Sequence, residues 1–254
     1  MRRSTRLLAI ALPAVLAAVP VALAGADPAS GGPEQSAPLT SEVASTLPRA
    51  IEAPPSLIAR VEPGATVALR SRPGGPAVLR VGDTTEFGST QRFGVVRNRG
   101  RWLGVTTPAL PNGTLGWVDR RASGVAIERT RWSIHADISR RTVVLRRAGR
   151  LVKRLRVAVG RPGSPTPTGR FAVTDKLSGG NYGPYYGCCI LALSATQPNT
   201  PPGWTGGNRM AIHGTDAPGA IGAAASAGCL RAADGDLAFL MSRVPVGTPV
   251  VIQR

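Results

Sequence analysis

The sequence predicts a mainly β protein: a small barrel, then a second β-rich domain with one short helix near the C-terminal end. Residues 57–127 contain short β-like runs separated by Gly, Pro and Asn turns, which suit a small barrel. From residue 132 onward apolar and polar residues alternate with period two, as in half-buried strands. Helical spacing follows at Leu237, Leu240 and Met241, and Asp234 is the expected N-cap of that helix.

The first residues of the chain predict an export signal. Three arginines precede an apolar run at residues 7–23, which ends in the small-x-small pattern that signal peptidase cleaves. Proline interrupts the run and no Lys/Arg stop-transfer flank follows it, so cleavage is favoured over a membrane anchor. We expect residues 1–24 to be removed. The product would be an exported protein of the cell envelope, periplasmic or in the extracytoplasmic wall, without a stable membrane span.

Three segments are expected after the signal. Residues 25–55 are rich in Pro, Ala and Ser without sustained periodicity, which predicts a disordered linker. Residues 56–127 form the first β domain and residues 128–254 the second. The runs that predict strands in the first domain are residues 66–70, 93–96, 102–105 and 116–118.

Alternation marks the strands of the second domain. Residues 132–138 begin it, and His135 lies on their polar face, so we expect His135 to be an exposed strand residue. A turn at Ala148-Gly149 separates two later strands. Residues 166–169 interrupt the sheet, because prolines restrict the backbone and a glycine frees it. The other expected strands are residues 142–145, 151–159, 171–174, 189–193 and 210–212.

The positive charge of the chain indicates which classes of partner it can bind. The formal net charge is +17, and removal of the three signal arginines leaves +14, which favours a polyanion such as an anionic cell wall. The chain lacks a zinc-finger spacing, an aromatic RNA-binding motif and a basic helix, so we expect no nucleic-acid partner. Neither CxxC nor HxxxH spacing occurs, and we expect no metal and no cofactor.

Histidine and cysteine are scarce, with two and three copies, yet His213 and Cys229 lie in one short segment. A base and a nucleophile so close together indicate a cysteine-nucleophile site. His213 follows a strand that would hold it rigidly. Cys229 precedes the expected helix, and the positive end of that helix and the imidazole would lower the thiol pKa. The amides of Gly228 and Cys229 are expected to be free to hold an oxyanion.

The other two cysteines, Cys188 and Cys189, are adjacent. Neighbouring Cα atoms lie about 3.8 Å apart, below the usual separation in a disulfide. We therefore expect both to be buried small hydrophobic residues, with a regulatory pairing to Cys229 as the alternative.

Residues 99–105 and 116–119 resemble the late strands of bacterial SH3-like domains. The resemblance implies that the first domain is a small SH3-like β-barrel. Two alternatives stay open for Trp102 and Trp117: they line a wall-binding groove, or they fill the core of the barrel.

The second domain resembles the L,D-transpeptidase catalytic domain, also called the YkuD domain, of bacterial cell-wall enzymes. The resemblance rests on several motifs that follow one another in the family's order over most of residues 131–254. Several motifs in the same order are more specific than any single motif. The motifs are residues 134–139, 166–171, 212–215, 226–231 and 247–250. The family activity is attack on the third residue of a peptidoglycan tetrapeptide stem, loss of D-Ala, and resolution of a thioester by an amine. The product is a cross-link between two third residues.

Site residues follow from the resemblance and from their surroundings. The resemblance implies that Cys229 is the nucleophile and His213 the base, that the Gly214 carbonyl orients the imidazole, and that the Gly228 amide serves the oxyanion. Three residues are candidates for substrate binding: Arg231, Ser226 and Tyr186.

Each of these candidates has an alternative role. Arg231 would either bind a substrate carboxylate or tie the loop down, and Ser226 is expected mainly to hydrogen-bond within the loop. Tyr185 and Tyr186 would form a lid. Ala227 departs from the family, which most often has a histidine there, and we expect this to alter the rate or selectivity rather than abolish activity.

Three other functions stay open. Water in place of the amine would make the protein an L,D-carboxypeptidase. A wall-binding protein with an impaired cysteine site would bind through Trp102 and Trp117. A sortase also uses His, Cys and Arg, but its arginine normally comes from a separate strand, whereas Arg231 is two residues from Cys229.

Overall fold

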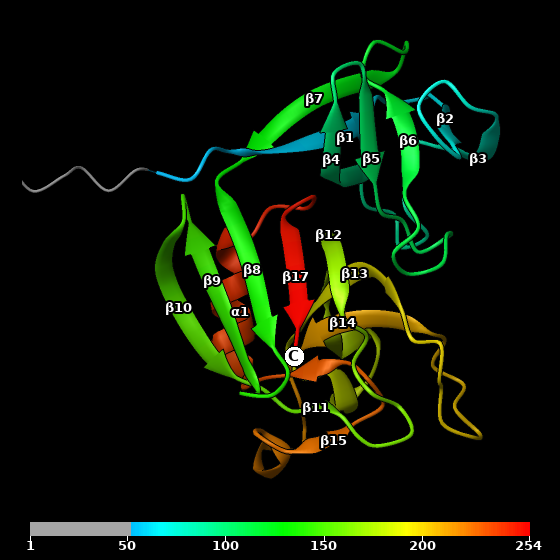
Figure 1. The fold of residues 1–254 in the computed structure, drawn as a ribbon. Helices are drawn as coiled ribbons and strands as arrows, with labels where there is room; N and C mark the ends of the chain where they lie inside the picture. Colours follow the sequence, from blue (N-terminus) through cyan, green and yellow to red (C-terminus); the bar gives the residue numbers. More distant parts are fainter. Residues whose placement is uncertain (1–51) are drawn as a thin grey trace, which may run out of the picture. The chain divides into compact units, whose positions relative to one another are not determined.

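A computed structural model describes residues 52–254 of the chain (Figure 1). The expected signal at residues 1–24 and nearly all of the expected linker at residues 25–55 lie outside the described residues. The strands of the first sheet are β1 (Ser56–Val61), β2 (Val67–Arg70), β3 (Ala77–Val81), β4 (Arg92–Arg99), β5 (Trp102–Val105), β6 (Gly116–Asp119) and β7 (Val125–Thr130).

The second half continues with ten strands and one α-helix. These elements are β8 (Trp132–Asp137), β9 (Thr142–Arg147), β10 (Arg150–Arg156), β11 (Val159–Gly160), β12 (Gly169–Ser178), β13 (Cys189–Thr196), β14 (Arg209–His213), β15 (Ala224–Ser226), β16 (Leu230–Arg231), α1 (Asp234–Arg243) and β17 (Pro249–Gln253). The predicted mainly β class with a short helix after Cys229 is confirmed.

The first sheet has the strand order β3-β2-β6-β5-β4-β1-β7 and a core of its own. Leu69 and Leu103 are among its fully buried residues. Trp117 is buried and Trp102 is half-buried, and the guanidinium group of Arg99 covers the Trp117 ring. Trp117 pairs with Gly104, whereas the neighbouring pair of Leu103 and Val118 belongs to the core. Trp117 therefore lies on the other face of the sheet, against Arg99, and the alternative in which it fills this core is wrong. Assignment of this sheet to the SH3-like class stays a prediction.

The second sheet has the order β10-β9-β8-β17-β12-β13-β14-β16. Alternating inward residues such as Ile134 and Leu145 pack with Leu237 and Leu240 of α1 in one core, which explains why the helix lies on one face of the sheet (Figure 1). The sheet curls, because Ala158, just after β10, pairs with Arg231 of β16. The curl brings the C-terminal strands that carry the candidate site back toward the first strands.

Local geometry agrees with the predicted turn between β9 and β10. Ala148 and Gly149 both have positive φ values, 51° and 82°, as the tight turn of a β-hairpin requires. The prediction that Asp234 is the N-cap of the helix is wrong. Ala233 is the N-cap, and the Asp234 carboxylate accepts a hydrogen bond from the Thr215 amide at 3.2 Å instead. Across residues 52–254 no helix is long and apolar enough to cross a membrane.

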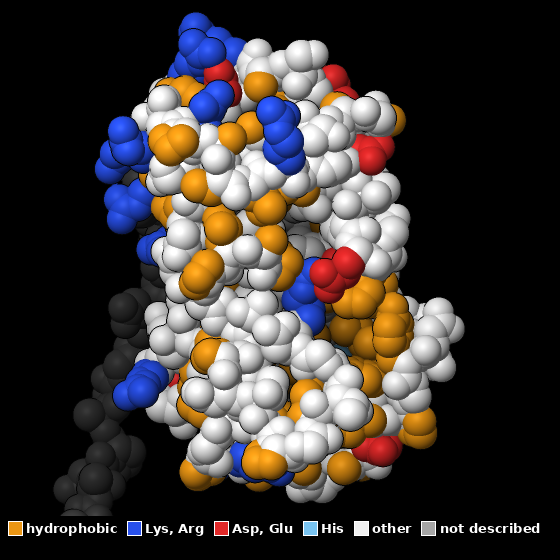
Figure 2. Space-filling view, turned by 90° about the vertical axis from the view of Figure 1, so that its right-hand side faces the viewer, with side chains coloured by type: hydrophobic (Ala, Val, Ile, Leu, Met, Phe, Trp, Pro, Cys, Tyr) orange, Lys and Arg blue, Asp and Glu red, His pale blue; other side chains and the backbone are white. Residues whose placement is uncertain are grey.

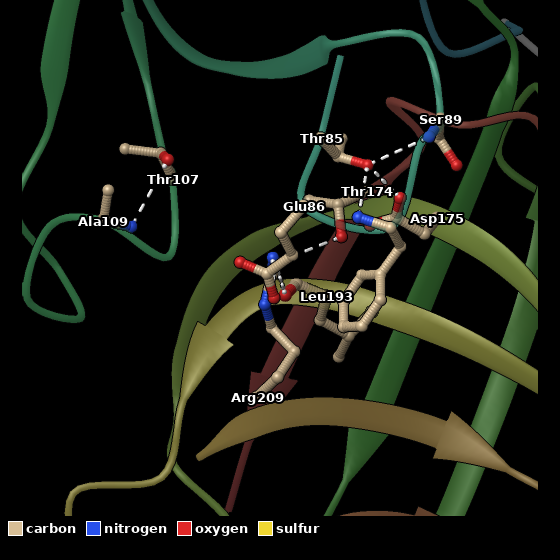
Figure 3. A network of polar contacts seen from close by, with 10 residues as sticks. Thr85, Glu86, Ser89, Thr107, Ala109, Thr174, Asp175, Leu193 and Arg209 are labelled. Carbon is tan, nitrogen blue, oxygen red and sulfur yellow. Dashed lines mark hydrogen bonds and ion pairs between the residues drawn. The ribbon is translucent and has the colours of Figure 1, made fainter. Parts of the chain in front are cut away.

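Both sheets belong to one compact unit, Ala50–Arg254. The loop between β3 and β4 reaches the second sheet: the Thr85 hydroxyl donates to the buried Asp175 carboxylate, and Glu86 forms a 2.9 Å ion pair with Arg209 (Figure 3). Arg209 also donates to the Leu193 carbonyl at 3.0 Å. The first sheet is thus tied to β12, β13 and β14, the strands next to His213.

Candidate active site

His213 ends β14 and is fully buried. Its Nδ1 lies 2.6 Å from the Gly214 carbonyl oxygen, so Nδ1 carries the proton and donates it there. Nε2 is then an acceptor, and it has no hydrogen-bond partner within residues 52–254. Burial lowers the His213 pKa to about 4, against a smaller raising effect of the Gly214 bond. The imidazole is therefore neutral, with a free lone pair, at neutral pH.

Cys229 is a free thiol between β15 and β16. Burial raises its pKa, and the Ala211 backbone and the charge of Arg231 offset this only in part. The expectation that the helix and the imidazole lower this pKa is therefore wrong. The physical reason is that β16 separates Cys229 from α1, which begins only at Asp234, while the surrounding residues desolvate the sulfur.

The backbone around Cys229 is fixed by a buried serine. Ser226 Oγ donates to the Cys229 carbonyl at 2.6 Å and accepts from the Gly228 amide at 3.0 Å. The Gly228 amide is therefore not free for an oxyanion, contrary to expectation. Ser226 ends β15 and is fully buried, and its hydroxyl bonds within this segment. The Cys229 amide makes no such bond to another described residue. It is the oxyanion donor that the geometry leaves available.

Two side chains that sequence reasoning did not assign hold the same loop. Thr166 Oγ1 donates to the Gly228 carbonyl at 2.7 Å, and Gln197 Nε2 donates to the Ala227 carbonyl at 3.0 Å. Gly228 has a φ of 123°, and a Cβ there would collide with the Gln197 amide. Thr166 begins the family motif at residues 166–171, whereas no sequence signal pointed to Gln197.

A hollow opens beside the thiol. Its lining includes Cys229, Ala227, Tyr185, Tyr186 and Trp204. Figure 2 shows the face of the molecule on which hydrophobic side chains gather, next to a basic and an acidic side chain. Three aromatic rings share the lining with the polar side chains of Gln197, Thr200, Asn208 and Arg209, and the lining contains no carboxylate. This mixture of rings and hydrogen-bonding groups suits a peptide-like ligand beside the sulfur.

Aromatic rings connect this hollow to the buried imidazole. The ring centroids of Tyr186 and Tyr185 lie 4.9 and 5.6 Å from that of His213. Both tyrosine rings therefore cover His213, and their role as a lid stays a prediction. The Tyr185 hydroxyl accepts a hydrogen bond from Arg231, whose guanidinium lies 4.2 Å from the Tyr185 ring centroid. Arg231 thus holds Tyr185 in place, while its buried Nε has no partner among the described residues.

The first sheet reaches the same aromatic group, a contact that sequence reasoning missed. Phe87, in the loop between β3 and β4, lies edge-on to Tyr182 at 6.3 Å, and Tyr182 lies edge-on to Tyr186 at 6.3 Å. Glu86 beside it pairs with Arg209, which lines the hollow. Figure 3 shows this loop against β12 and β13.

Cys188 and Cys189 form a disulfide and are only partly buried, so the expectation of two buried free thiols is wrong. The Cα separation of 3.7 Å is the short one expected for neighbours, and it does not prevent the bond. The Cys189 carbonyl accepts from the Gly214 amide at 3.0 Å, so the pair lies beside the residue that orients His213. His135 lies elsewhere, on β8. Within the described part of the chain, no cluster of His, Cys, Asp and Glu could hold a metal ion.

Comparison with known families covers the part of the chain that carries this site. The L,D-transpeptidase catalytic domain family YkuD matches residues 131–252. Residues 131–252 belong to this family. One relative is the YkuD protein of Bacillus subtilis, whose name assigns L,D-transpeptidase activity provisionally. It is 34% identical to this chain over 125 residues, which make up 48% of this chain and 66% of that protein.

The YkuD domain of the chain has further relatives. The Bacillus licheniformis YkuD protein is 35% identical over 123 residues, 48% of this chain and 65% of its own length. The matches thus span just under two thirds of these relatives. Among solved structures, an L,D-transpeptidase from Mycobacterium smegmatis aligns with a TM-score of 0.42 and 17% identity, over 79% of this chain and 100% of that one.

Proposed function

We propose that the chain is an exported, cysteine-dependent L,D-transpeptidase that acts on tetrapeptide stems of peptidoglycan in an anionic cell wall. One observation carries the proposal: a free thiol opens onto a hollow lined by Tyr185 and Tyr186, and the same two rings cover a buried histidine whose Nε2 has no partner among the described residues. A thiol and a neutral imidazole are the two groups that acyl transfer through a thioester requires.

The first half-reaction forms the thioester. Both groups start neutral, because burial raises the Cys229 pKa and lowers that of His213. The thiol proton therefore passes to His213 Nε2 as Sγ attacks the carbonyl carbon of the third stem residue. The Cys229 amide would donate to the resulting oxyanion. When the intermediate collapses, the proton returns from His213 to the leaving D-Ala amine.

The second half-reaction consumes the thioester. The side-chain amine of a second stem gives its proton to His213 Nε2 and attacks the thioester carbonyl, and the thiol is regenerated with that proton. The result is an amide bond between two third residues. Water in place of the amine would give a tripeptide, the carboxypeptidase outcome.

Product analysis tests the proposal. Purified protein that lacks residues 1–24 is incubated with a disaccharide-tetrapeptide, and the products are weighed by mass spectrometry. We expect a cross-linked dimer and free D-Ala from the wild type and neither from Cys229→Ala. If tripeptide forms without dimer, the activity is that of an L,D-carboxypeptidase and not of a transpeptidase. A wild-type protein that makes no product would contradict both, and would favour a wall-binding protein.

A further inference from the structure

The outer face of the second sheet carries several arginines that the proposed function does not use. Strand register places Arg170, Val251, His135, Val144 and Arg154 side by side across β12, β17, β8, β9 and β10. Paired residues of neighbouring strands point to the same face of a sheet. The opposite face is the one buried against α1.

More arginines flank this row. Arg146 and Arg156 lie on the same face, because Arg146 pairs with Ser133 of β8 and Arg156 with Thr142 of β9. Burial first, and then the charges of Arg146 and Arg170, lower the pKa of His135, which agrees with their common orientation. The face is hollowed where residues of β8, β9 and β10 meet, and this hollow shares no residue with the one beside Cys229.

Almost no negative charge compensates these arginines. Within residues 52–254, Arg146, Arg154, Arg156 and Arg170 form no ion pair with a carboxylate. The acid at the edge of the face, Asp137, is already bonded to Ser139 and Arg140. The face therefore offers uncompensated positive charge to a partner.

The spread of the cations selects a class of ligand. Strands lie about 4.8 Å apart, so the row from Arg154 to Arg170 extends about 19 Å over four strand spacings. Arginines that are spread over this length, rather than gathered around one point, match an extended polymer with repeated phosphate groups better than a single small anion. Stacking of nucleobases needs exposed aromatic rings, and the row itself offers aliphatic Val251 and Val144 between its cations.

We propose that this sheet face, defined by Arg146, Arg154, Arg156, Arg170 and His135, binds a linear phosphate-bearing polyanion. The inference does not rest on the proposed enzyme activity. Its role would be to hold the chain on an anionic matrix while the hollow beside Cys229 stays open to substrate.

Long-chain inorganic polyphosphate is the probe for the test. Binding of fluorescently labelled polyphosphate to the full chain is followed by anisotropy at several salt concentrations, for wild type, Arg154→Gln/Arg170→Gln and the matched control Arg72→Gln/Arg129→Gln. The control arginines are exposed and form no ion pair among the described residues: Arg72 lies in the turn between β2 and β3, and Arg129 lies in β7. Melting curves show that each variant is folded.

The expected result is site-specific. Removal of two phosphate contacts should weaken binding about tenfold and reduce the slope of log Kd against log salt by about 1.4 to 1.8, while the control keeps the wild-type slope. Equal losses in both double variants, or no binding by wild type, would overturn the proposal. Preferential binding to phosphatidylglycerol vesicles would overturn it in favour of a membrane surface. Cys229→Ala should bind polyphosphate like wild type, so the two proposals fail separately.

Discussion

The chemistry of individual residues in the site depends on burial more than on charge. His213 is buried and oriented by one backbone carbonyl, and Cys229 is desolvated by its neighbours. Both pKa shifts favour the neutral forms, because an ion pair would have to be created inside a poorly solvated site. The pair therefore differs from one in which a thiolate and an imidazolium exist before substrate binds.

This neutral pair predicts an unusually low acid limb in the pH profile. Acylation needs an unprotonated Nε2, so the rate should stay level from pH 7 to pH 5 and fall by half near the His213 pKa of about 4. The measurement is the rate of acylation by a carbapenem at each pH, with circular dichroism to show that the protein is folded. A half-loss near pH 6.5, the ordinary histidine pKa, would contradict the assignment of the buried imidazole as base.

Ala227 stands where the resemblance to the family's nucleophile motif leads us to expect a histidine. Its side chain lines the hollow, while its carbonyl is held by Gln197, so the loop keeps its shape without a histidine. We expect Ala227→His to change the acylation rate by less than about tenfold, because His213 already supplies the base. His213→Ala should lower the rate by about 10² to 10⁴. Equal and large effects of both substitutions would show that position 227 takes part in proton transfer.

At the scale of secondary-structure elements, no signal in the sequence indicated that the loop between β3 and β4 contacts the aromatic residues around His213. It contributes Phe87 to an aromatic chain that leads through Tyr182 and Tyr186 to His213. The first sheet thereby supports the outer wall of the site. This contact follows from the fold of both sheets together and could not be derived from either segment alone.

Removal of the Phe87 ring tests this support. An edge-on aromatic pair is worth about 0.5 to 1.5 kcal/mol, so Phe87→Ala should lower the second-order acylation rate by about two- to tenfold. Val78→Ala is the control, because Val78 of β3 is 50% exposed and makes none of these aromatic contacts. Stopped-flow fluorescence measures the rates. If Phe87→Ala acylates like the control, the loop has only a structural role.

Sequence periodicity predicted those elements whose own residues alternate. β8, β9 and the hairpin turn before β10 were predicted from alternation, because one face of β8 and of β9 is buried. β13 and β14 are buried on both faces and were predicted from apolar runs instead. β3 was not predicted, since its five residues are half-buried or exposed. Within the site, the scarcity of His213 and Cys229 singled them out, but the bonding of Ser226 and Gln197 depends on loops that meet only in the folded chain.

At the scale of the whole molecule, polar contacts join the two sheets. Thr85 bonds the buried Asp175, and Thr106 Oγ1 lies 2.8 Å from Ser194 Oγ. The other Asp175 oxygen, Oδ2, has no partner within residues 52–254. Removal of the Thr85 hydroxyl would leave the buried Asp175 carboxylate without this hydrogen bond. We therefore expect such a substitution to lower the free energy of unfolding.

We therefore predict that both sheets unfold in one transition and that Thr85→Val lowers the free energy of unfolding by about 1 to 3 kcal/mol. The exposed Thr168 serves as the control, and Thr168→Val should change this free energy by less than about 0.5 kcal/mol. Urea titration followed by tryptophan fluorescence and by circular dichroism makes the measurement. Two separate transitions would show that the sheets are energetically independent.

The most direct test of the account is the identity of the acylated residue. The protein is treated with a carbapenem, its intact mass is measured, and the adduct is located by peptide mapping. We predict one adduct per chain, on Cys229, because the other two cysteines are joined in a disulfide; Cys229→Ala should form none. An adduct on Cys188 or Cys189, or an adduct that persists in Cys229→Ala, would contradict the assignment of Cys229 as the nucleophile.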